Sequence, residues 1–159
     1  MALLEPEIAG NAGQIGRTCL AVGSALHLVR PLGFRLDDRA LRRAGMDYWD
    51  DLDVRVHAGW PAFRRTMAGA FEAGRVFAFT TRGDARSTFP AAVSGPAETA
   101  GDAVLLFGPE SRGLPAAVVA EAVPVRLPMR AGTRSLNLSA AVAAALYLAW
   151  SGQGFEGGS

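Results

Sequence analysis

Short apolar runs alternate along the chain with longer stretches that mix apolar and polar residues. The runs VFAFT and AVLLF are almost wholly apolar, which is typical of strands buried on both faces of a parallel sheet. The mixed stretches between them are long enough to form helices. The pattern predicts strands at residues 2–4, 25–29, 54–56, 76–80, 103–107 and 123–127.

Helices are expected between the strands, because start and stop signals occur there. Asn11 is a candidate N-cap. Pro61 suits the first turn of a helix, and Gly45 would end a short helix capped by Asp37 or Asp38. The pattern predicts helices from the Asn11 cap to about residue 24, through residues 41–44, and at residues 61–71, 115–122 and 139–150.

Strands that alternate with helices indicate an α/β fold with a mostly parallel sheet. No internal repeat or linker interrupts the pattern, so we expect one domain over residues 1–151 and a flexible tail at 152–159. In open parallel sheets, ligands bind beyond the carboxyl ends of the strands. The segments at that edge would be residues 5–17, the loop after Thr80, residues 107–115 and the loop after Leu127.

Composition narrows the classes of function. The net charge is +1, so no overall field indicates a nucleic-acid partner. All sixteen basic residues are Arg, which suits phosphate and carboxylate ligands. The single Cys19 excludes an internal disulfide and a Cys-rich zinc site, and no metal-ligand spacing occurs, so no metal is expected. No apolar run reaches the ~18 residues of a membrane helix and no export signal is seen, so we expect a cytoplasmic protein without a membrane partner.

The glycines of GNAGQIG, residues 10–16, follow a strand and precede a helix. A dinucleotide site is one reading, but the spacing is G-x-x-G-x-x-G and no acidic residue follows the next strand. A glycine-rich helix start is the simpler interpretation. Arg17 would then point near the amino-terminal mouth of that helix, beside the ligand edge of the sheet.

The segment FGPESRGLP follows an apolar strand directly. Gly108 and Gly113 permit close backbone approach or positive φ, and the two prolines stiffen the loop. Such a loop suits an adenine or a ribose. A turn whose Glu110 and Arg112 are solvated or paired explains the residues equally well.

Polar residues also crowd before the last helix. One of Ser135, Asn137 and Ser139 is expected to be its N-cap, and Arg134 lies beside them. Three such residues exceed the needs of one cap, so a binding role is the alternative to simple capping. Elsewhere, the two histidines are interpreted as structural.

The segment RLDDRALRRAGMDYW contains a local cluster of arginines, with aspartates between them. It is either an RNA-phosphate surface or a mixed, solvated helix. The arginines are Arg35, Arg39, Arg42 and Arg43.

Four stretches, in order, resemble the motifs of one family: EPEIAGNAGQIGR, LRRAGMDYW, FGPESRGLP and LPM…TRSLNLSAAVAAALYLAW. Together they resemble the SPOUT superfamily of knotted methyltransferases, and within it the minimal TrmL-type tRNA 2′-O-methyltransferases. The likeness covers about residues 4–150. The departures are Ala9 and Gly10 where proline is common, and Gln14 where asparagine is usual.

The resemblance implies a C-terminal trefoil knot and S-adenosylmethionine as the cofactor, with S-adenosylhomocysteine as the product. It implies a homodimer whose site is completed across the interface, for which Tyr147 and Trp150 of the uncharged last helix are candidates. Residues 108–113, which include Glu110 and Gly113, would form a knot loop whose backbone wraps the cofactor. Glu110 and Arg112 would hold that loop or help frame the methyl pocket. The positions that match the family's cofactor contacts are Phe79, Gly108, Leu127 and Ser135.

The resemblance also implies methyl transfer to the 2′-hydroxyl of the wobble pyrimidine of leucine tRNAs. Arg17 matches the residue that activates this hydroxyl. Because the pKa of arginine is above ~12, we expect Arg17 to stabilise the alkoxide or orient the hydroxyl instead of taking the proton. Asn137 and Ser139 would position the ribose or the first loop. RNA contacts are expected from Asn11, Arg39, Arg42, Arg43 and Arg134.

Two other classes of function stay open. One is a methyltransferase of the same superfamily that acts on another tRNA position or on rRNA. The other is a protein that binds RNA or the cofactor without catalysis.

Overall fold

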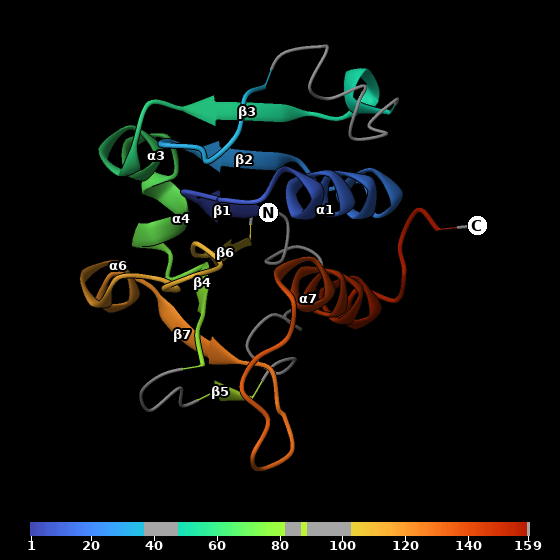
Figure 1. Cartoon of the computed structure of the whole chain (residues 1–159). Coiled ribbons are helices and arrows are strands. Elements are labelled where there is room, and N and C mark those ends of the chain that lie inside the picture. Colours follow the sequence, from blue (N-terminus) through green and yellow to red (C-terminus); the bar gives the residue numbers. More distant parts are fainter. Residues whose placement is uncertain (37–47, 82–86, 89–102, 159) are drawn as a thin grey trace.

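A parallel sheet forms the centre of the computed structural model, which describes residues 1–36, 48–81, 87–88 and 103–158 (Figure 1). Within these residues the sheet has seven strands in the order β3-β2-β1-β6-β4-β7-β5, and every neighbouring pair is parallel. The strands are β1 (Ala2–Leu4), β2 (Leu26–Val29), β3 (Val54–His57), β4 (Val76–Phe79), β5 (Ser87–Thr88), β6 (Val104–Phe107) and β7 (Val123–Arg126).

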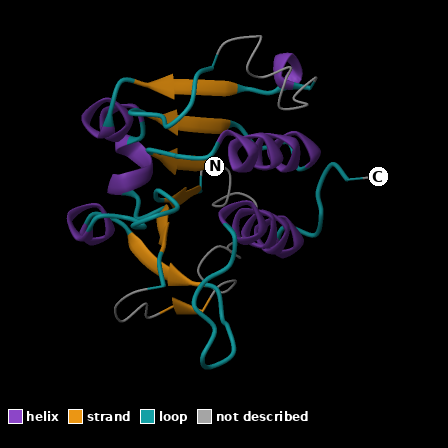
Figure 2. Ribbon diagram, in the orientation of Figure 1, coloured by secondary structure: helices purple, strands orange, loops and turns teal. Residues whose placement is uncertain are grey.

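Helices cover both faces of this sheet. Helices α1 (Ala9–Ala21) and α7 (Leu138–Gly152) pack against each other on one face (Figure 2). The other face carries α3 (Trp60–Thr66), α4 (Ala68–Glu72) and α6 (Ala116–Ala120). The short 3-10 helix η1 (Trp49–Asp51) lies against α1.

The central strands β1, β4 and β6 are continuously apolar because each one supplies both cores. Leu105 and Phe107 of β6 pack with the α1 and α7 side, whereas Val104 and Leu106 pack with the other. Side chains of a strand alternate between its faces, so a strand buried on both sides needs apolar residues throughout. This is why VLLF reads as an unbroken apolar run.

The expected strands are confirmed within a residue or two of their ends, and so is the α/β class with a parallel sheet. The helix expected at residues 61–71 is broken at Met67 into α3 and α4. The helix expected through residues 41–44, together with Arg39, Arg42 and Arg43, lies outside the described residues.

Two cap predictions had different outcomes. Asn137 is the N-cap of α7, and its side-chain oxygen accepts from the backbone N–H of Ser139 and of Ala140. Asn11 is not the N-cap of α1, because that helix begins at Ala9 with Ile8 as its cap residue. A carboxylate from a distant loop binds the residues just before α1, as described below.

The order of the strands positions the site. The chain builds β1, β2 and β3 outward, continues to β4 and β5 on the other side, and then returns to insert β6 between β1 and β4. The loops that follow β1, β4, β6 and β7 therefore meet at one carboxyl edge. Within the described part of the chain, no helix is both long and apolar enough to cross a membrane.

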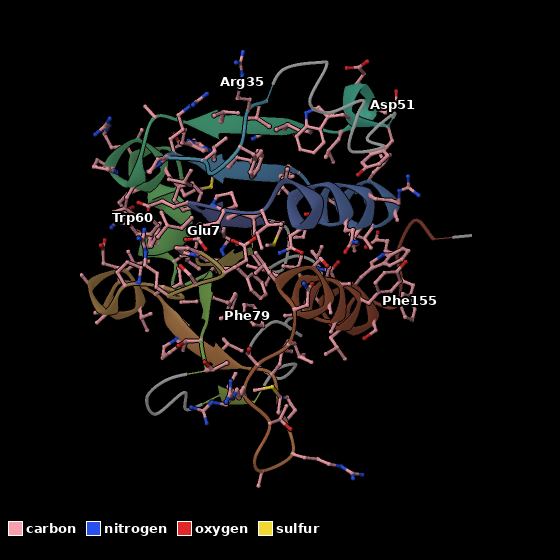
Figure 3. All side chains as sticks on the ribbon, viewed as in Figure 1. Glu7, Arg35, Asp51, Trp60, Phe79 and Phe155 are labelled. Carbon is pink, nitrogen blue, oxygen red and sulfur yellow. The ribbon has the colours of Figure 1, made fainter. Side chains whose placement is uncertain are left out.

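The residues after α7 turn back toward it. The indole N–H of Trp150 donates to the Glu156 carbonyl at 2.9 Å, and the Phe155 ring packs edge-on against Trp150. Phe155 thus lies by the end of α7, on the opposite side of the molecule from Trp60 (Figure 3).

Candidate functional site

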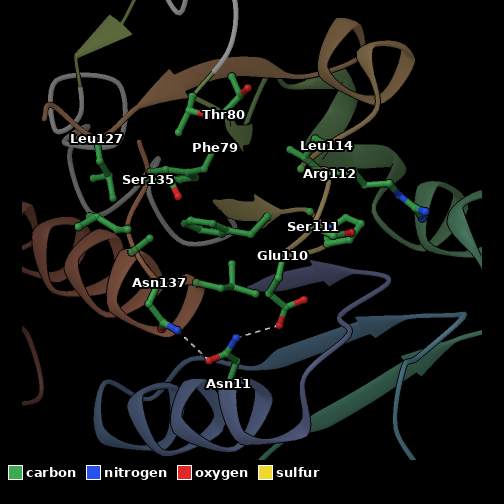
Figure 4. A pocket seen from close by; sticks show the side chains of 18 of the residues that line it. Asn11, Phe79, Thr80, Glu110, Ser111, Arg112, Leu114, Leu127, Ser135 and Asn137 are labelled. Atoms are coloured by element: carbon green, nitrogen blue, oxygen red, sulfur yellow. Dashed lines mark hydrogen bonds between the residues drawn. The ribbon is translucent and has the colours of Figure 1, made fainter. Parts of the chain in front are cut away.

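A cavity of about 520 Å³ lies at the carboxyl edge of the sheet (Figure 4). The four segments that the sequence places at this edge all contribute to it: the start of α1, the loop after β4, the loop after β6 and the loop after β7. Nine of the residues expected to form the site line it, namely Asn11, Phe79, Gly108, Glu110, Gly113, Leu127, Arg134, Ser135 and Asn137.

The inner wall of the cavity is aromatic and apolar. The rings of Phe79 and Phe107 stack with centroids 4.3 Å apart and an interplanar angle of 7°. Leu127 and Leu138 add aliphatic surface. A wall of this kind suits a flat, uncharged ring, whereas the polar rim around Ser135 suits hydroxyl groups.

The loop after β6 closes tightly on itself. A Cβ on Gly108 would lie 2.4 Å from the Leu114 nitrogen and 2.5 Å from the Gly113 carbonyl carbon. Gly113 has a φ of 69°, and its N–H donates to the Pro109 carbonyl at 2.8 Å. Both glycines are therefore required by the backbone path, and the loop presents peptide groups to the cavity.

Glu110 ties this loop to the start of α1. One carboxylate oxygen accepts from the Glu7 N–H at 2.8 Å. The other accepts from the Ile8 N–H at 3.3 Å and from the Asn11 amide at 3.0 Å. A carboxylate at a helix amino terminus satisfies free N–H groups and interacts favourably with the helix dipole. Glu110 thus fixes the two residues that precede α1 and also holds the Asn11 side chain of its first turn.

The loop after β1 also binds the loop after β6 in the opposite direction. We call the mutual hydrogen bonds of Glu7 with Glu110 and Ser111 the clamp. The Glu7 carboxylate accepts from the Ser111 N–H at 2.8 Å and from the Ser111 hydroxyl at 2.7 Å. These two hydrogen bonds hold the pKa of Glu7 below its ordinary value. Arg112 forms an ion pair with Glu5. The sequence analysis assigned no role to Glu5 or Glu7. The two carboxylates of EPE nevertheless match the hydroxyl and guanidinium donors of ESR, and this match could have indicated the contact.

A chain of side-chain hydrogen bonds crosses from the clamp to α7. The Asn11 oxygen accepts from the Asn137 amide at 3.1 Å, while the Asn11 amide donates to Glu110 (Figure 4). The Ser139 hydroxyl lies 2.6 Å from the Asn137 oxygen and 2.5 Å from the Gln14 oxygen. These hydrogen bonds hold the cavity loop, α1 and the start of α7 in fixed positions relative to one another.

Two of the expected catalytic residues lie outside the cavity lining. Ser139 is buried behind Asn137. Arg17 is on the exposed side of α1, with its guanidinium 4.9 Å from the centre of the Tyr48 ring. The expectation that Arg17 lies near the amino-terminal mouth of its helix is wrong, because α1 begins at Ala9 and Arg17 stands well along it.

The remaining candidates have structural surroundings. His27 Nδ1 and His57 Nε2 are 2.9 Å apart in a buried pair beside Phe63, on the far face of the sheet from α1 and α7. Burial lowers the pKa of His27 to about 4 and also lowers that of His57, so both rings are neutral at pH 7. Burial raises the pKa of the Cys19 thiol to about 11. Within the described ranges no cluster of three potential metal ligands is found.

The fold and the cavity define a doubly wound α/β protein with a cavity beyond the carboxyl ends of a parallel sheet, where proteins of this class bind ligands. The model of the SpoU rRNA Methylase family matches residues 1–147. The chain belongs to this family and is a methyltransferase.

Curated relatives cover almost the whole chain. A tRNA (cytidine(34)-2′-O)-methyltransferase of Burkholderia ambifaria is 48% identical, with 99% of this chain and 97% of that protein covered. The corresponding protein of Yersinia pestis is 43% identical over 99% and 95%.

Solved structures agree. One, described as giving structural insights into the 2-OH methylation of C/U34 on tRNA, has a TM-score of 0.82 and 43% identity, covering 95% of this chain and 93% of that one. A putative RNA methyltransferase of Bacillus anthracis has a TM-score of 0.83 and 36% identity, with coverage of 99% and 95%.

Proposed function

We propose that this protein is an S-adenosylmethionine-dependent tRNA methyltransferase that modifies the ribose 2′-hydroxyl of the wobble pyrimidine. Leucine isoacceptors are the proposed substrates, and the cytoplasm is the proposed compartment. The observation that carries the proposal is the cavity, whose lining draws on three of the four stretches that resemble the family's motifs, those within residues 5–17, 107–115 and 127–150. The names of the full-length relatives supply the position of the modified nucleotide.

The cavity residues fit the cofactor. Phe79 and Leu127 offer apolar surface for an adenine, and the loop between Gly108 and Gly113 offers peptide N–H and C=O groups for hydrogen bonds. The cofactor, when bound, supplies an electrophilic methyl group on a sulfonium. Glu110 is the one carboxylate among the described lining residues, and its oxygens already accept three N–H groups. It therefore serves the loop and is not free to take the proton of the ribose.

Arg17 is proposed to act on the substrate from the partner subunit. Arg17 does not line the cavity of its own chain, so a site that uses it needs a second copy. An apolar surface supports the homodimer: Tyr147 and Leu148 are 46% and 38% exposed on α7, and Leu20 is 38% exposed on α1. A two-fold contact through this face would place each Arg17 toward the other protomer.

Within that arrangement the polar residues of the chain have different roles. Arg17 stabilises the alkoxide that forms as the hydroxyl loses its proton. Asn137 and Ser139 hold the start of α7 and the first loop in place, so that the ribose is aligned with the cofactor. Asn11 has both ends of its amide engaged within the chain, so we assign it to positioning and not to RNA contact.

The proposed knot concerns the loop after β7 and helix α7. This segment leaves β7, borders the cavity opposite the loop after β6, and continues into a helix that packs on α1 and β6. A trefoil knot would require the end of the chain after β7 to pass through a loop formed by an earlier segment. A knotted cavity loop would also be rigid before the cofactor arrives, which lowers the entropic cost of binding.

RNA phosphates are proposed to contact Arg134 at the cavity rim and the arginines Arg39, Arg42 and Arg43. Charge reversal at Arg42 and Arg43 is expected to weaken tRNA binding and to reduce its salt dependence, because each phosphate contact releases a counterion. An unchanged affinity and an unchanged salt slope would remove these two residues from the RNA surface.

Nucleoside mass spectrometry tests the function directly. Purified protein is incubated with S-adenosylmethionine and unmethylated leucine tRNAs, and the digested RNA is scanned for 2′-O-methylated cytidine and uridine. We expect methylation at the wobble position, and none in the same tRNA carrying a 2′-deoxy nucleotide there. Methylation at another position, or only in rRNA, would redirect the substrate. Absence of any product together with absence of cofactor binding would refute the proposal.

A further inference from the structure

We infer that Glu7 is a positioning residue of the reaction, which holds the cofactor loop in its binding conformation through Ser111. The inference rests on the proposed function, since the ligand of the cavity is taken to be S-adenosylmethionine. Neither the family match nor the resemblance of the motifs assigns a role to this residue.

The loop after β6 has little apolar support where it borders the cavity. Its base is buried at Gly108 and Pro109, and Leu114 is buried where the loop ends. Between them Ser111, Arg112 and Gly113 are exposed. Packing therefore fixes the two ends of the loop but not its tip, so the position of the tip depends on hydrogen bonds.

Those hydrogen bonds come from the residues that follow β1. Glu7 receives two of them from Ser111, one from the backbone and one from the side chain, at 2.8 and 2.7 Å. In the opposite direction, the Glu7 N–H donates to Glu110 at 2.8 Å. Each segment thus holds the other by hydrogen bonds, and the paired residues are more than 100 positions apart in the chain. A carboxylate that accepts two hydrogen bonds from one residue fixes both the position and the orientation of that residue.

Backbone packing adds a second constraint on the Glu7 segment. A Cβ on Gly33 would lie 2.5 Å from the Glu7 carbonyl oxygen, so the loop after β2 presses directly against the Glu7 peptide. The Gly33 N–H donates to the Pro6 carbonyl at 2.9 Å. The Glu7 backbone is consequently held in a fixed position, and its carboxylate can hold Ser111 in place.

This arrangement preorganises the cavity. A loop already in its binding conformation loses less conformational entropy when the ligand binds. Loss of the clamp is therefore expected to act mainly on cofactor affinity, and to leave the global fold in place because the loop ends stay packed.

Three variants and one control test the inference. Glu7→Gln keeps the size of the side chain but removes the charge and one of its two acceptor oxygens. Ser111→Ala removes the hydroxyl, and Ser111→Thr retains it. Glu121→Gln is the matched control, because Glu121 is a partly exposed carboxylate that accepts from Trp60 and Arg64 on the other face of the sheet.

Two readouts are compared on the full-length protein. Calorimetric titration with S-adenosylhomocysteine measures the affinity of the cavity. Trypsin cleavage after the exposed Arg112, followed by mass spectrometry without any ligand, measures the order of the loop. Thermal unfolding is recorded for each variant, so that a loss of global stability is recognised.

We expect Glu7→Gln to weaken S-adenosylhomocysteine binding about tenfold, the range expected when a hydrogen bond to a charged group is lost. Cleavage after Arg112 should be faster, while cleavage after Arg130 stays the same. KM for S-adenosylmethionine should rise with little change in KM for tRNA. Ser111→Ala should resemble Glu7→Gln, the two should be non-additive when combined, and Ser111→Thr and Glu121→Gln should resemble the wild type.

Wild-type affinity and wild-type cleavage in Glu7→Gln would overturn the inference. Additive effects of Glu7→Gln and Ser111→Ala would overturn it as well, because the two residues would then act independently. If the wild type bound no S-adenosylhomocysteine, the proposed cofactor would fail and the positioning role with it, whatever the cleavage pattern showed about the clamp.

Discussion

The Asn137 amide donates to the Asn11 side-chain oxygen at 3.1 Å and so joins the first turn of α7 to α1 across 126 residues of sequence. The same Asn11 amide donates to Glu110 of the cavity loop. The buried Asn11 side chain therefore connects three segments that border the cavity, and its removal should affect the position of each of them.

Replacement of Asn11 by Ala is expected to destabilise the fold by about 1–3 kcal/mol, because it leaves polar groups of Glu110 and Asn137 without their partner in a partly buried place. Chemical denaturation measures this loss. Thr18→Ala is a suitable control on the same helix, since the Thr18 hydroxyl makes an exposed bond to the Gln14 carbonyl. Equal stabilities of the two variants would contradict the central role of Asn11.

Replacement of Gly108 by Ala should disturb the cavity loop. The added Cβ would meet the Leu114 nitrogen at 2.4 Å, and its three nearest atoms are all backbone, so no flexible side chain can move away. We expect S-adenosylhomocysteine affinity to fall by at least about tenfold in calorimetry. Gly69→Ala in α4 has no atom within 4 Å of its new Cβ and should bind normally, or be slightly more stable as helix propensity predicts.

Replacement of Arg17 by Ala should separate binding from catalysis. Arg17 does not line the cavity of its own chain, so cofactor affinity is expected to stay near the wild-type value. The turnover number should fall by about 10²–10³, the usual cost of losing a donor to a developing oxyanion. Methyl transfer from labelled S-adenosylmethionine measures this, with Arg65→Ala on the opposite face as the control.

A mixture of two impaired variants, assayed at a cofactor concentration too low for Gly108→Ala to bind, would test whether Arg17 acts across the dimer. Arg17→Ala and Gly108→Ala are co-expressed and purified as a heterodimer, in which one of the two sites has both residues intact if the arginine comes from the partner. Recovered activity is expected. A heterodimer no more active than its parent variants would place the action of Arg17 within its own chain.

Acid should weaken the fold through the histidine pair. His27 has a folded pKa of about 4 against an ordinary value of 6.5, because burial, the nearby amino terminus and His57 all oppose its charge. The unfolded chain takes up a proton below about pH 6.5 and the folded chain does not until about pH 4. The contribution of neutral His27 to the free energy of unfolding is therefore complete above pH 6.5 and is lost as the pH falls toward 4.

Unfolding free energies measured from pH 7.5 to 4.5 check this expectation. The double variant His27→Leu/His57→Phe removes both rings together, so no ring nitrogen is left without its partner. Its stability should depend less on pH over the same interval, with the carboxylates titrating alike in both proteins. Parallel curves for the two proteins would show that the histidine pair contributes nothing to acid sensitivity.

Local patterns determined the elements and the place of the site. Apolar runs such as VFAFT and AVLLF are strands because a fully buried strand has no polar face, and the rule that ligands lie beyond parallel strands predicted the four segments that line the cavity. The glycines at 108 and 113 could also be read locally, since close approach and positive φ depend on the backbone itself.

The tertiary structure alone decided which side chains meet. Asn11 looked like a helix cap, yet its side chain binds Glu110 and Asn137 instead, and the partners of Glu7 depend on β6 lying beside β1. Arg17 lies on an exposed side of α1, outside the cavity lining of its own chain. Hydrophobic period and turn chemistry act over a few neighbouring residues, whereas these contacts depend on the order in which distant strands pair, and that order is set by the packing of the whole sheet.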